Sequence, residues 1–241
     1  MDTMERKDFL KGIGILGFGA IALPSINSCS TDDSSTTIPD DTDSCNITPT
    51  ETAGPFPTIL PSTLVTNDIR SDRTGVLLTI NISLKNANSN YAALAGAIID
   101  IWHCDKDGNY SEYGGTSMQS TNYTNVHFLR GRQTSDANGA VSFTSIFPGW
   151  YSGRATHIHV HIYNSSGTSL LVTQIAFPEG ANSAVATVNT STASGYTKGM
   201  TGYTYNSSDN VFSDSVTCEL ASITGSITDG YVLESEIKVA I

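Results

Sequence analysis

The apolar residues of this 241-residue chain stand in short runs that alternate with polar residues, and this pattern constrains the fold most strongly. Val76–Leu84 (VLLTINISL) has the two-residue period of a strand with one buried face. Similar runs are Ala97–Trp102, Ala140–Phe147, His157–Tyr163, Leu170–Phe177 and Val232–Val239. Turn signals such as Asn138-Gly139 separate the runs, and no amphipathic helix intervenes. We therefore expect an all-β fold, an antiparallel β-sandwich with long loops that form a cleft.

One stretch departs from this alternation. Asn182–Val211 is polar and rich in Gly, Ser and Thr, and we expect either a long loop or a short helix there. Residues 46–241 as a whole are numerous enough to form one domain with a sizeable core.

The first 29 residues have the features of an export signal. Arg6 and Lys7 precede the apolar stretch Gly12–Leu23, which is too short to span a bilayer. Ile26–Cys29 resembles a bacterial lipobox, so we expect Cys29 to carry a lipid that anchors the protein to the cell envelope, periplasmic or surface-exposed. The alternative is an ordinary signal peptide with an incidental cysteine. The segment ERKDFLKG also resembles a twin-arginine signal with Lys7 in place of the second arginine, so the export route stays open.

Residues 30–45 are polar and acidic and contain no aromatic residue, which predicts a flexible tether. In the whole chain 23 acidic residues outweigh 12 Lys and Arg, and the formal net charge is −11. This balance argues against nucleic acid as a partner, because phosphate binding needs clustered basic residues. Apart from a lipid on Cys29, no membrane contact is expected, because no apolar run approaches the length of a membrane span.

Three cysteines remain if Cys29 carries a lipid. Cys45 lies at the start of the predicted domain and Cys218 near its end, so a disulfide between them would tie the N-terminal segment to the last strands. Cys104 is a competing partner, and the spacing alone leaves the pairing open.

The segment HIHVHIY places His157, His159 and His161 two residues apart. On a strand these side chains share one face, which is compatible with a metal site and also with a solvated sheet surface. A zinc or copper protein that uses these three histidines is therefore one hypothesis.

Three longer segments narrow the choice. They are TPTETAGPFP at 48–57, DIWHCDKDGNYSEY at 100–113 and FPGWYSGRATHIHVHI at 147–162. Together they resemble the intradiol ring-cleavage dioxygenases, the catechol and protocatechuate dioxygenase family, with likeness extending from about Thr48 to Gln174. The resemblance implies one non-haem Fe(III) per chain. It also implies an enzyme that uses O₂ to open a small aromatic diol between its two hydroxyl carbons, giving a cis,cis-muconate-type product.

Carried over residue by residue, the resemblance implies four iron ligands: Tyr110, Tyr151, His157 and His159. Such a set suits a hard trication, because phenolates supply anionic oxygen and a bound cation favours the deprotonated phenol. The implied catalytic residues are Tyr151 as a base, Arg154 as a stabiliser of developing charge, and Gln174, which orients Arg154 or the substrate. The implied substrate-binding residues are Gly54 and Pro55, and Trp150 is a further candidate that would either line the cleft or pack in the core. His161 has no ligand counterpart in the family and is expected on the sheet face or behind the ligands.

Only six positions separate Tyr151 from His157, fewer than in the cytoplasmic enzymes of this family, so the substrate range is open. A non-catalytic β-sandwich lipoprotein that binds a ligand at the cell surface is the main alternative from another class. The sequence does not determine the oligomeric state.

Overall fold

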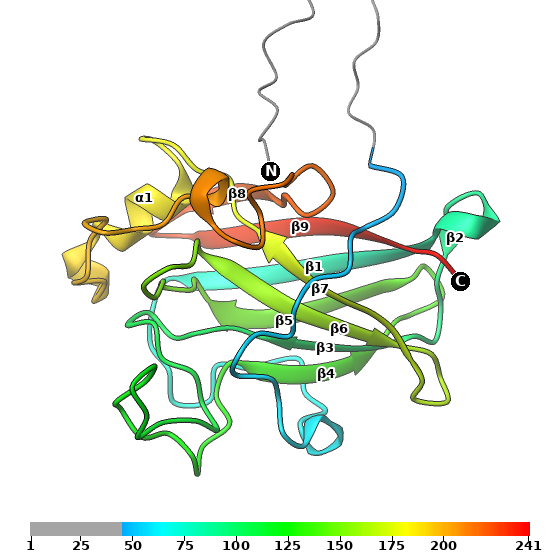
Figure 1. Ribbon diagram of the computed structural model, residues 1–241, viewed down its shortest axis with the longest axis horizontal. Coiled ribbons are helices and arrows are strands. Elements are labelled where there is room, and N and C mark those ends of the chain that lie inside the picture. The colour runs from blue at the N-terminus through cyan, green and yellow to red at the C-terminus, as the bar shows by residue number, and fades with distance from the viewer. Residues whose placement is uncertain (1–44) are drawn as a thin grey trace, which may run out of the picture. The chain divides into compact units, whose positions relative to one another are not determined.

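The computed structural model describes residues 45–241, which form two β-sheets (Figure 1). The predicted export signal, the predicted lipid attachment site Cys29 and residues 30–44 of the predicted tether lie outside the described residues. Within 45–241, no helix is both long and apolar enough to cross a membrane.

The first sheet joins five strands around β1. Its strands are β1 (Leu77–Asn86), β2 (Ala92–Ala93), β5 (Ala140–Ile146), β8 (Ser222–Ser226) and β9 (Gly230–Val239). β5 and β2 pair with one edge of β1 and β9 with the other. The β1–β9 pair is parallel, whereas the other pairs of named strands are antiparallel, so the expected antiparallel sandwich holds with one parallel pair.

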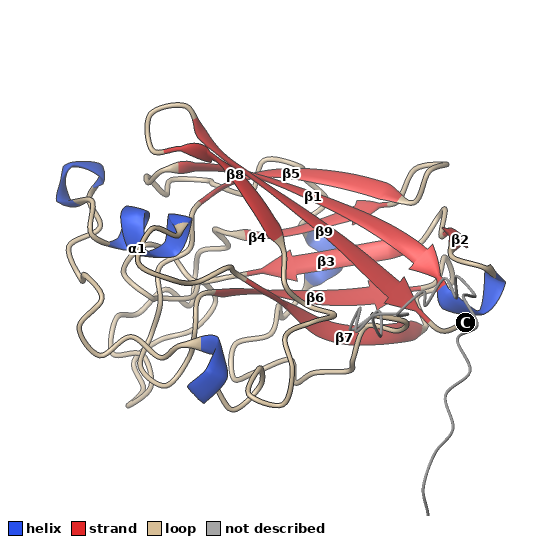
Figure 2. Ribbon diagram, turned by 90° about the horizontal axis from the view of Figure 1, so that it is seen from above, coloured by secondary structure: helices blue, strands red, loops and turns tan. Residues whose placement is uncertain are grey.

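The second sheet has the order β4-β3-β6-β7 and lies under the first (Figure 2). Its strands are β3 (Ile98–Trp102), β4 (Arg130–Thr134), β6 (His157–Tyr163) and β7 (Ser169–Ala176). β4 (RGRQT) and β8 (SITGS) were not predicted, because neither has an apolar alternation to mark it. Their strand pairing depends on their neighbours.

The core lies between the two sheets. Leu78, Ile80 and Ile82 of β1 are at most 1% exposed and belong to the same buried cluster as Ile158 and Val160 of β6. Because successive strand residues point to opposite faces, His157 and His159 project from the outer face of the second sheet. Both are nevertheless buried, so the loops must cover this face, and the candidate site is built there.

The connection from β7 to β8 contains one short helix, α1 (Ala184–Asn189), and 3₁₀ turns at Thr192–Ser194 and Asn206–Ser208. The Ser183 hydroxyl accepts a hydrogen bond from the Ala186 amide and caps α1. The expectation of a loop or short helix in this region is confirmed. Two further 3₁₀ turns lie elsewhere, at Pro61–Thr63 and Ala87–Ser89.

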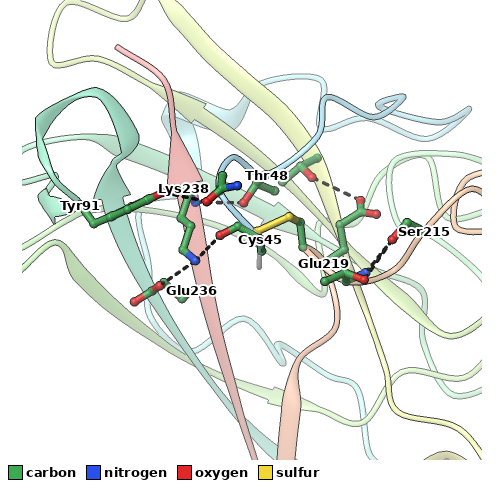
Figure 3. The surroundings of a disulfide bond; sticks show 11 residues. Cys45, Thr48, Tyr91, Ser215, Glu219, Glu236 and Lys238 are labelled. Carbon is green, nitrogen blue, oxygen red and sulfur yellow. Dashed lines mark hydrogen bonds and ion pairs between the residues drawn. A yellow bond between two sulfur atoms is a disulfide. The ribbon is translucent and has the colours of Figure 1, made fainter. Parts of the chain in front are cut away.

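A disulfide joins Cys45 to Cys218, and Cys104 is free and buried, which confirms the pairing of the chain ends (Figure 3). From Cys45 the chain runs as a strap, residues 45–58, across strands of both sheets. The Thr48 amide donates to the Lys238 carbonyl of β9, and the Glu51 amide donates to the Val172 carbonyl of β7. The strap thereby carries Gly54 and Pro55 to the outer face of the second sheet.

Candidate active site

Four side chains from three parts of the chain converge on the outer face of the second sheet. His157 and His159 come from β6, Tyr110 from the loop between β3 and β4, and Tyr151 from the loop between β5 and β6. The Nε2 atoms of the two histidines lie 3.1 Å apart, and the Tyr110 hydroxyl lies 3.2 Å from His157 Nε2. The Tyr151 ring contacts both the Tyr110 ring and the His157 ring at centroid distances of 5.7 Å.

The hydrogen bonds of His157 determine which nitrogen is available. Its Nδ1 lies 2.6 Å from the Ala155 carbonyl. Because a carbonyl oxygen can only accept a hydrogen bond, Nδ1 carries the hydrogen, and Nε2 of the neutral ring carries the lone pair. One imidazole lone pair then faces both the Tyr110 hydroxyl and His159 Nε2, and it cannot accept from both fully. A cation among these atoms would use every lone pair.

Two further buried atoms have no hydrogen-bond partner among the described residues, the Tyr151 hydroxyl and His159 Nδ1. Donor atoms about 2.1 Å from a shared metal and roughly 90–110° apart lie about 3 Å from each other, which matches the distances between Tyr110, His157 and His159. The donors present therefore fit a metal ion. Among residues 45–241 no group of three or more His, Cys, Asp or Glu side chains can hold a metal, so any site here depends on the phenols.

Burial makes all four groups neutral in the absence of a cation. It lowers the pKa of His157 to about 3, with a further contribution from the charge of Arg154, and it lowers the pKa of His159 well below its usual value. Burial also raises the pKa of Tyr110 well above 10, and it raises the pKa of Tyr151. A multivalent cation reverses this balance for the phenols, because it stabilises the phenolate directly.

Arg154 is held beside this cluster by a buried network. Its Nε donates to both carboxylate oxygens of Asp209, and its Nη2 donates to Gln174 Oε1 at 2.5 Å. Gln174 in turn donates to the Thr52 carbonyl of the strap. The predicted contact between Gln174 and Arg154 is therefore present, and Nη1 of Arg154 lies 3.5 Å from His157 Nε2.

Asp209 was not predicted. It is fully buried and also accepts hydrogen bonds from the amides of Ala155 and Val211. In the sequence it is one polar residue within a polar stretch, and nothing local distinguishes it from its neighbours.

A second buried arginine, also not predicted, holds the loop that carries Tyr110. Arg130 donates from Nε and Nη2 to Ser111, the residue after Tyr110, and from Nη1 to the Phe56 carbonyl of the strap. The amide of Gln119 secures the Tyr110 backbone on both sides, accepting from its N–H and donating to its carbonyl. Tyr110 thus lies in a rigid frame although its loop has no regular structure.

The predicted substrate-binding residues separate into two groups. Gly54 and Pro55 line a pocket of about 420 Å³ together with Tyr151 and Arg154. Trp150 does not line this pocket. It is 4% exposed, packs against Tyr203 in the main core and donates to the Gly199 carbonyl, so the structure assigns it to packing.

His161 makes hydrogen bonds that are separate from those of His157 and His159. Its Nε2 bonds the Ser169 hydroxyl and its Nδ1 bonds the Tyr163 hydroxyl, so both ring nitrogens are already used. The structure therefore places it on the sheet face, as expected, and gives no support to a metal site made of all three histidines.

A two-sheet β fold with buried tyrosines and histidines on a loop-covered face is the arrangement that the sequence motifs led us to expect. Comparison with known proteins identifies the same family. The profile of the family described as "Dioxygenase" matches residues 57–194, and the chain belongs to the intradiol ring-cleavage dioxygenase family. An intradiol ring-cleavage dioxygenase from Tetranychus urticae has a similar structure, with a TM-score of 0.70 and 26% identity. That similarity covers 81% of this chain and 95% of the Tetranychus urticae protein.

Two other relatives extend the comparison. Chlorocatechol 1,2-dioxygenase from Rhodococcus opacus is 30% identical over 142 residues, and the match spans 51% of this chain and 51% of that relative, about half its length. The dioxygenase domain of a carbohydrate-binding fusion protein from Streptomyces sp. SirexAA-E has a TM-score of 0.56 and 22% identity, over 81% of this chain and 99% of that one. At this identity it indicates a shared fold.

Proposed function

We propose that this protein is a ferric, non-haem dioxygenase that cleaves a catechol-type ring between its two hydroxyl carbons and yields a cis,cis-muconate-type product. The observation that carries the proposal is the convergence of Tyr110, Tyr151, His157 and His159, together with a buried Tyr151 hydroxyl that has no hydrogen-bond partner among the described residues. The names of the relatives, which include chlorocatechol 1,2-dioxygenase, support a catechol-type substrate.

The donor set favours iron in its ferric state over the other candidates. Two phenolates supply two of the three negative charges that a trication needs, and neutral imidazoles complete the set. When bound, Fe(III) would hold both oxygens of the diol and make the ring carbon reactive toward O₂. Zinc and copper sites more often use additional histidine or cysteine, and His161 is engaged elsewhere.

Tyr151 is suited to move a proton. Its hydroxyl has no hydrogen-bond partner among the described residues, and its side chain lines the pocket. As a phenolate it can accept at Oη one of the protons that the diol loses on binding. Tyr110 is fully buried, and Arg130 and Gln119 hold its loop, so we assign it the role of a ligand that stays in position and not that of a base.

Arg154 supplies a fixed positive charge at the reacting ring. Asp209 and Gln174 hold its guanidinium, so it needs no rearrangement when negative charge develops on the substrate oxygens. The strap excludes water from one side, because Gly54 lies against the His159 ring.

A ligand-binding protein without catalysis is the second candidate, since the pocket alone would bind a small ring. The buried Tyr151 hydroxyl, which has no hydrogen-bond partner among the described residues, favours the enzyme, because a pocket that only binds gains nothing from it. On sequence grounds alone, we also propose that the protein is exported and anchored to the cell envelope through a lipid on Cys29.

Visible absorption of the purified protein tests the proposal. Phenolate coordinated to Fe(III) absorbs in the visible, so the iron-loaded protein should be coloured, and anaerobic catechol should shift the band. Admitting O₂ should restore the original spectrum and release a muconate in a 1:1 ratio with the O₂ consumed. A colourless protein after ferric loading would refute the iron site. A band that shifts with catechol but never recovers in O₂ would favour the ligand-binding alternative.

A further inference from the structure

The pocket beside the metal-ligand candidates is lined by apolar residues, by uncharged polar residues and by one charged residue. Its apolar lining includes Pro55 from the strap, Met118 from the loop after β3 and Val211 from the segment before β8. Asn210, the other lining residue of that last segment, is polar and uncharged. Arg154 is the sole charged residue among those that line this pocket.

The guanidinium of Arg154 is held at the end of the pocket nearest the metal-ligand candidates. Its Nε is occupied by Asp209 and its Nη2 by Gln174, while Nη1 is the group that faces His157. A ring bound by its two oxygens at the metal candidates therefore meets this arginine at the oxygen end. Among the residues that line this pocket, none besides Arg154 is a cation that could pair with a carboxylate on the far side of the ring.

Two acidic residues lie near the pocket and supply no positive charge to its wall. Asp209 is fully buried behind Arg154, and Glu51 precedes the lining residue Thr52 on the strap. Burial raises the pKa of Glu51, and the charge of Asp214 adds to that effect, whereas the charge of Arg154 opposes it. An anionic substituent would be disfavoured here by the loss of its hydration, because no lining residue other than Arg154 offers a positive charge in return.

We propose that this pocket selects catechols with an uncharged, apolar ring substituent, such as a methyl group or a halogen, over carboxylated catechols, and that Met118 is a specificity-determining residue. This inference rests on the proposed function, since it assumes that the ring binds through its two hydroxyl oxygens. Met118 is suited to the task because its flexible thioether adapts to substituents of different size. It is also 66% exposed, so it can be exchanged without disturbing the core.

Three ligands separate charge from size: 4-methylcatechol, 3,4-dihydroxybenzoate and methyl 3,4-dihydroxybenzoate. The last two have similar shape, but only the acid carries a charge. Anaerobic calorimetric titration of the iron-loaded full chain should give dissociation constants about 10- to 100-fold lower for the two neutral ligands than for the acid. Equal affinity for the acid and its methyl ester would overturn the proposal, and so would tighter binding of the acid.

A lysine placed on the pocket wall should reverse the preference. Met118→Lys and, separately, Asn210→Lys should each improve the affinity for the acid relative to its ester by about tenfold, equivalent to roughly 1.4 kcal/mol. Val65→Lys is the matched control, because Val65 is 71% exposed and does not line this pocket, and there the ratio should stay unchanged. An unchanged ratio in Met118→Lys, with circular dichroism showing a folded chain, would overturn the role of Met118.

Binding and turnover distinguish the two proposals. If the neutral ligands bind more tightly but no ring is opened in O₂, the selectivity stands and the proposed catalysis fails. If rings are opened but the acid is the best substrate, the catalysis stands and the selectivity fails. If none of the three ligands binds to the iron-loaded protein, both proposals fail.

Discussion

Gly54 lies so close to His159 that a Cβ atom added to it would sit 2.9 Å from Cε1 of the imidazole. The glycine also has φ of +68°, which other residues rarely adopt. The strap and one metal-ligand candidate are thus fitted to each other, and the Cys45–Cys218 disulfide at the other end of the strap contributes to holding that fit.

Gly54→Ala should therefore displace the His159 ring or lift the strap. We expect iron affinity to fall by about tenfold or more, as is typical when a residue that supports a ligand is changed. Iron content per chain after dialysis against a graded chelator measures this. Gly199→Ala is a close control, because Gly199 has the same φ of +68° and a Cβ there meets nothing within 4 Å. Equal iron loss in both variants would show that backbone strain, and not contact with His159, is responsible.

Replacing Cys45 and Cys218 together by serine should lower the free energy of unfolding by about 2 to 5 kcal/mol, because the disulfide restricts the unfolded chain. Denaturant unfolding with and without reductant measures the effect. Reductant should destabilise the natural chain and leave the double variant unchanged, since Cys104 is already a free thiol. A natural chain whose stability does not respond to reductant would contradict the prediction.

Asp209→Asn should leave the buried Arg154 without its carboxylate partner. We expect the free energy of unfolding to fall by about 3 kcal/mol, the lower end of the range for breaking a buried ion pair. If Arg154 acts on developing charge, kcat/KM should also fall by about 100-fold. Asp229→Asn makes the same chemical change at an exposed position and should alter neither quantity appreciably. Denaturant unfolding measures the change in stability, and steady-state kinetics measure the change in kcat/KM, for both variants.

Glu219, next to the disulfide (Figure 3), should make stability depend on pH. Burial raises the pKa of its carboxyl to about 8, with added repulsion from Glu51 and Asp214, and its Oε2 has no partner among the described residues. Between about pH 4.5 and 8 the folded chain therefore retains a proton that the unfolded chain has released. The stability of the folded chain should fall as the pH rises through this window.

Glu219→Gln removes the titrating proton and should flatten that pH dependence. At pH 8 the variant should be more stable than the natural chain by about 1 to 3 kcal/mol, the usual penalty for a buried unpaired polar group. At pH 4.5 the two proteins should be nearly equal. Unfolding curves recorded across this range check the sign, and a natural chain that gains stability from pH 5 to 8 relative to the variant would contradict it.

The expectation of a lipid on Cys29 can be tested directly. Mass spectrometry of the chain from membranes of a bacterial host should show a mature N-terminus at Cys29 with a diacylglycerol adduct. Cys29→Ser should abolish the adduct and release the protein from the membrane fraction. A mature chain that begins at another residue and has no adduct would favour the ordinary signal peptide.

The sequence determined which segments become strands wherever apolar and polar residues alternate along the chain. Leu77–Asn86 and His157–Tyr163 were predicted because alternation of apolar and polar residues is a local property of the chain. The family motifs also located Tyr110, Tyr151, His157 and His159, because the spacing around each is short and specific.

Only the tertiary structure decided which distant residues meet these four. Asp209 reaches Arg154 across 55 positions, and Arg130 ties Phe56 to Ser111, contacts for which the local sequence gives no signal. Trp150, a candidate for the pocket wall, lies in the core, where its indole N–H donates to the Gly199 carbonyl and its ring packs against Tyr203. Local patterns specify strand periodicity, whereas the partners of buried charges and rings depend on how the sheets and loops pack together.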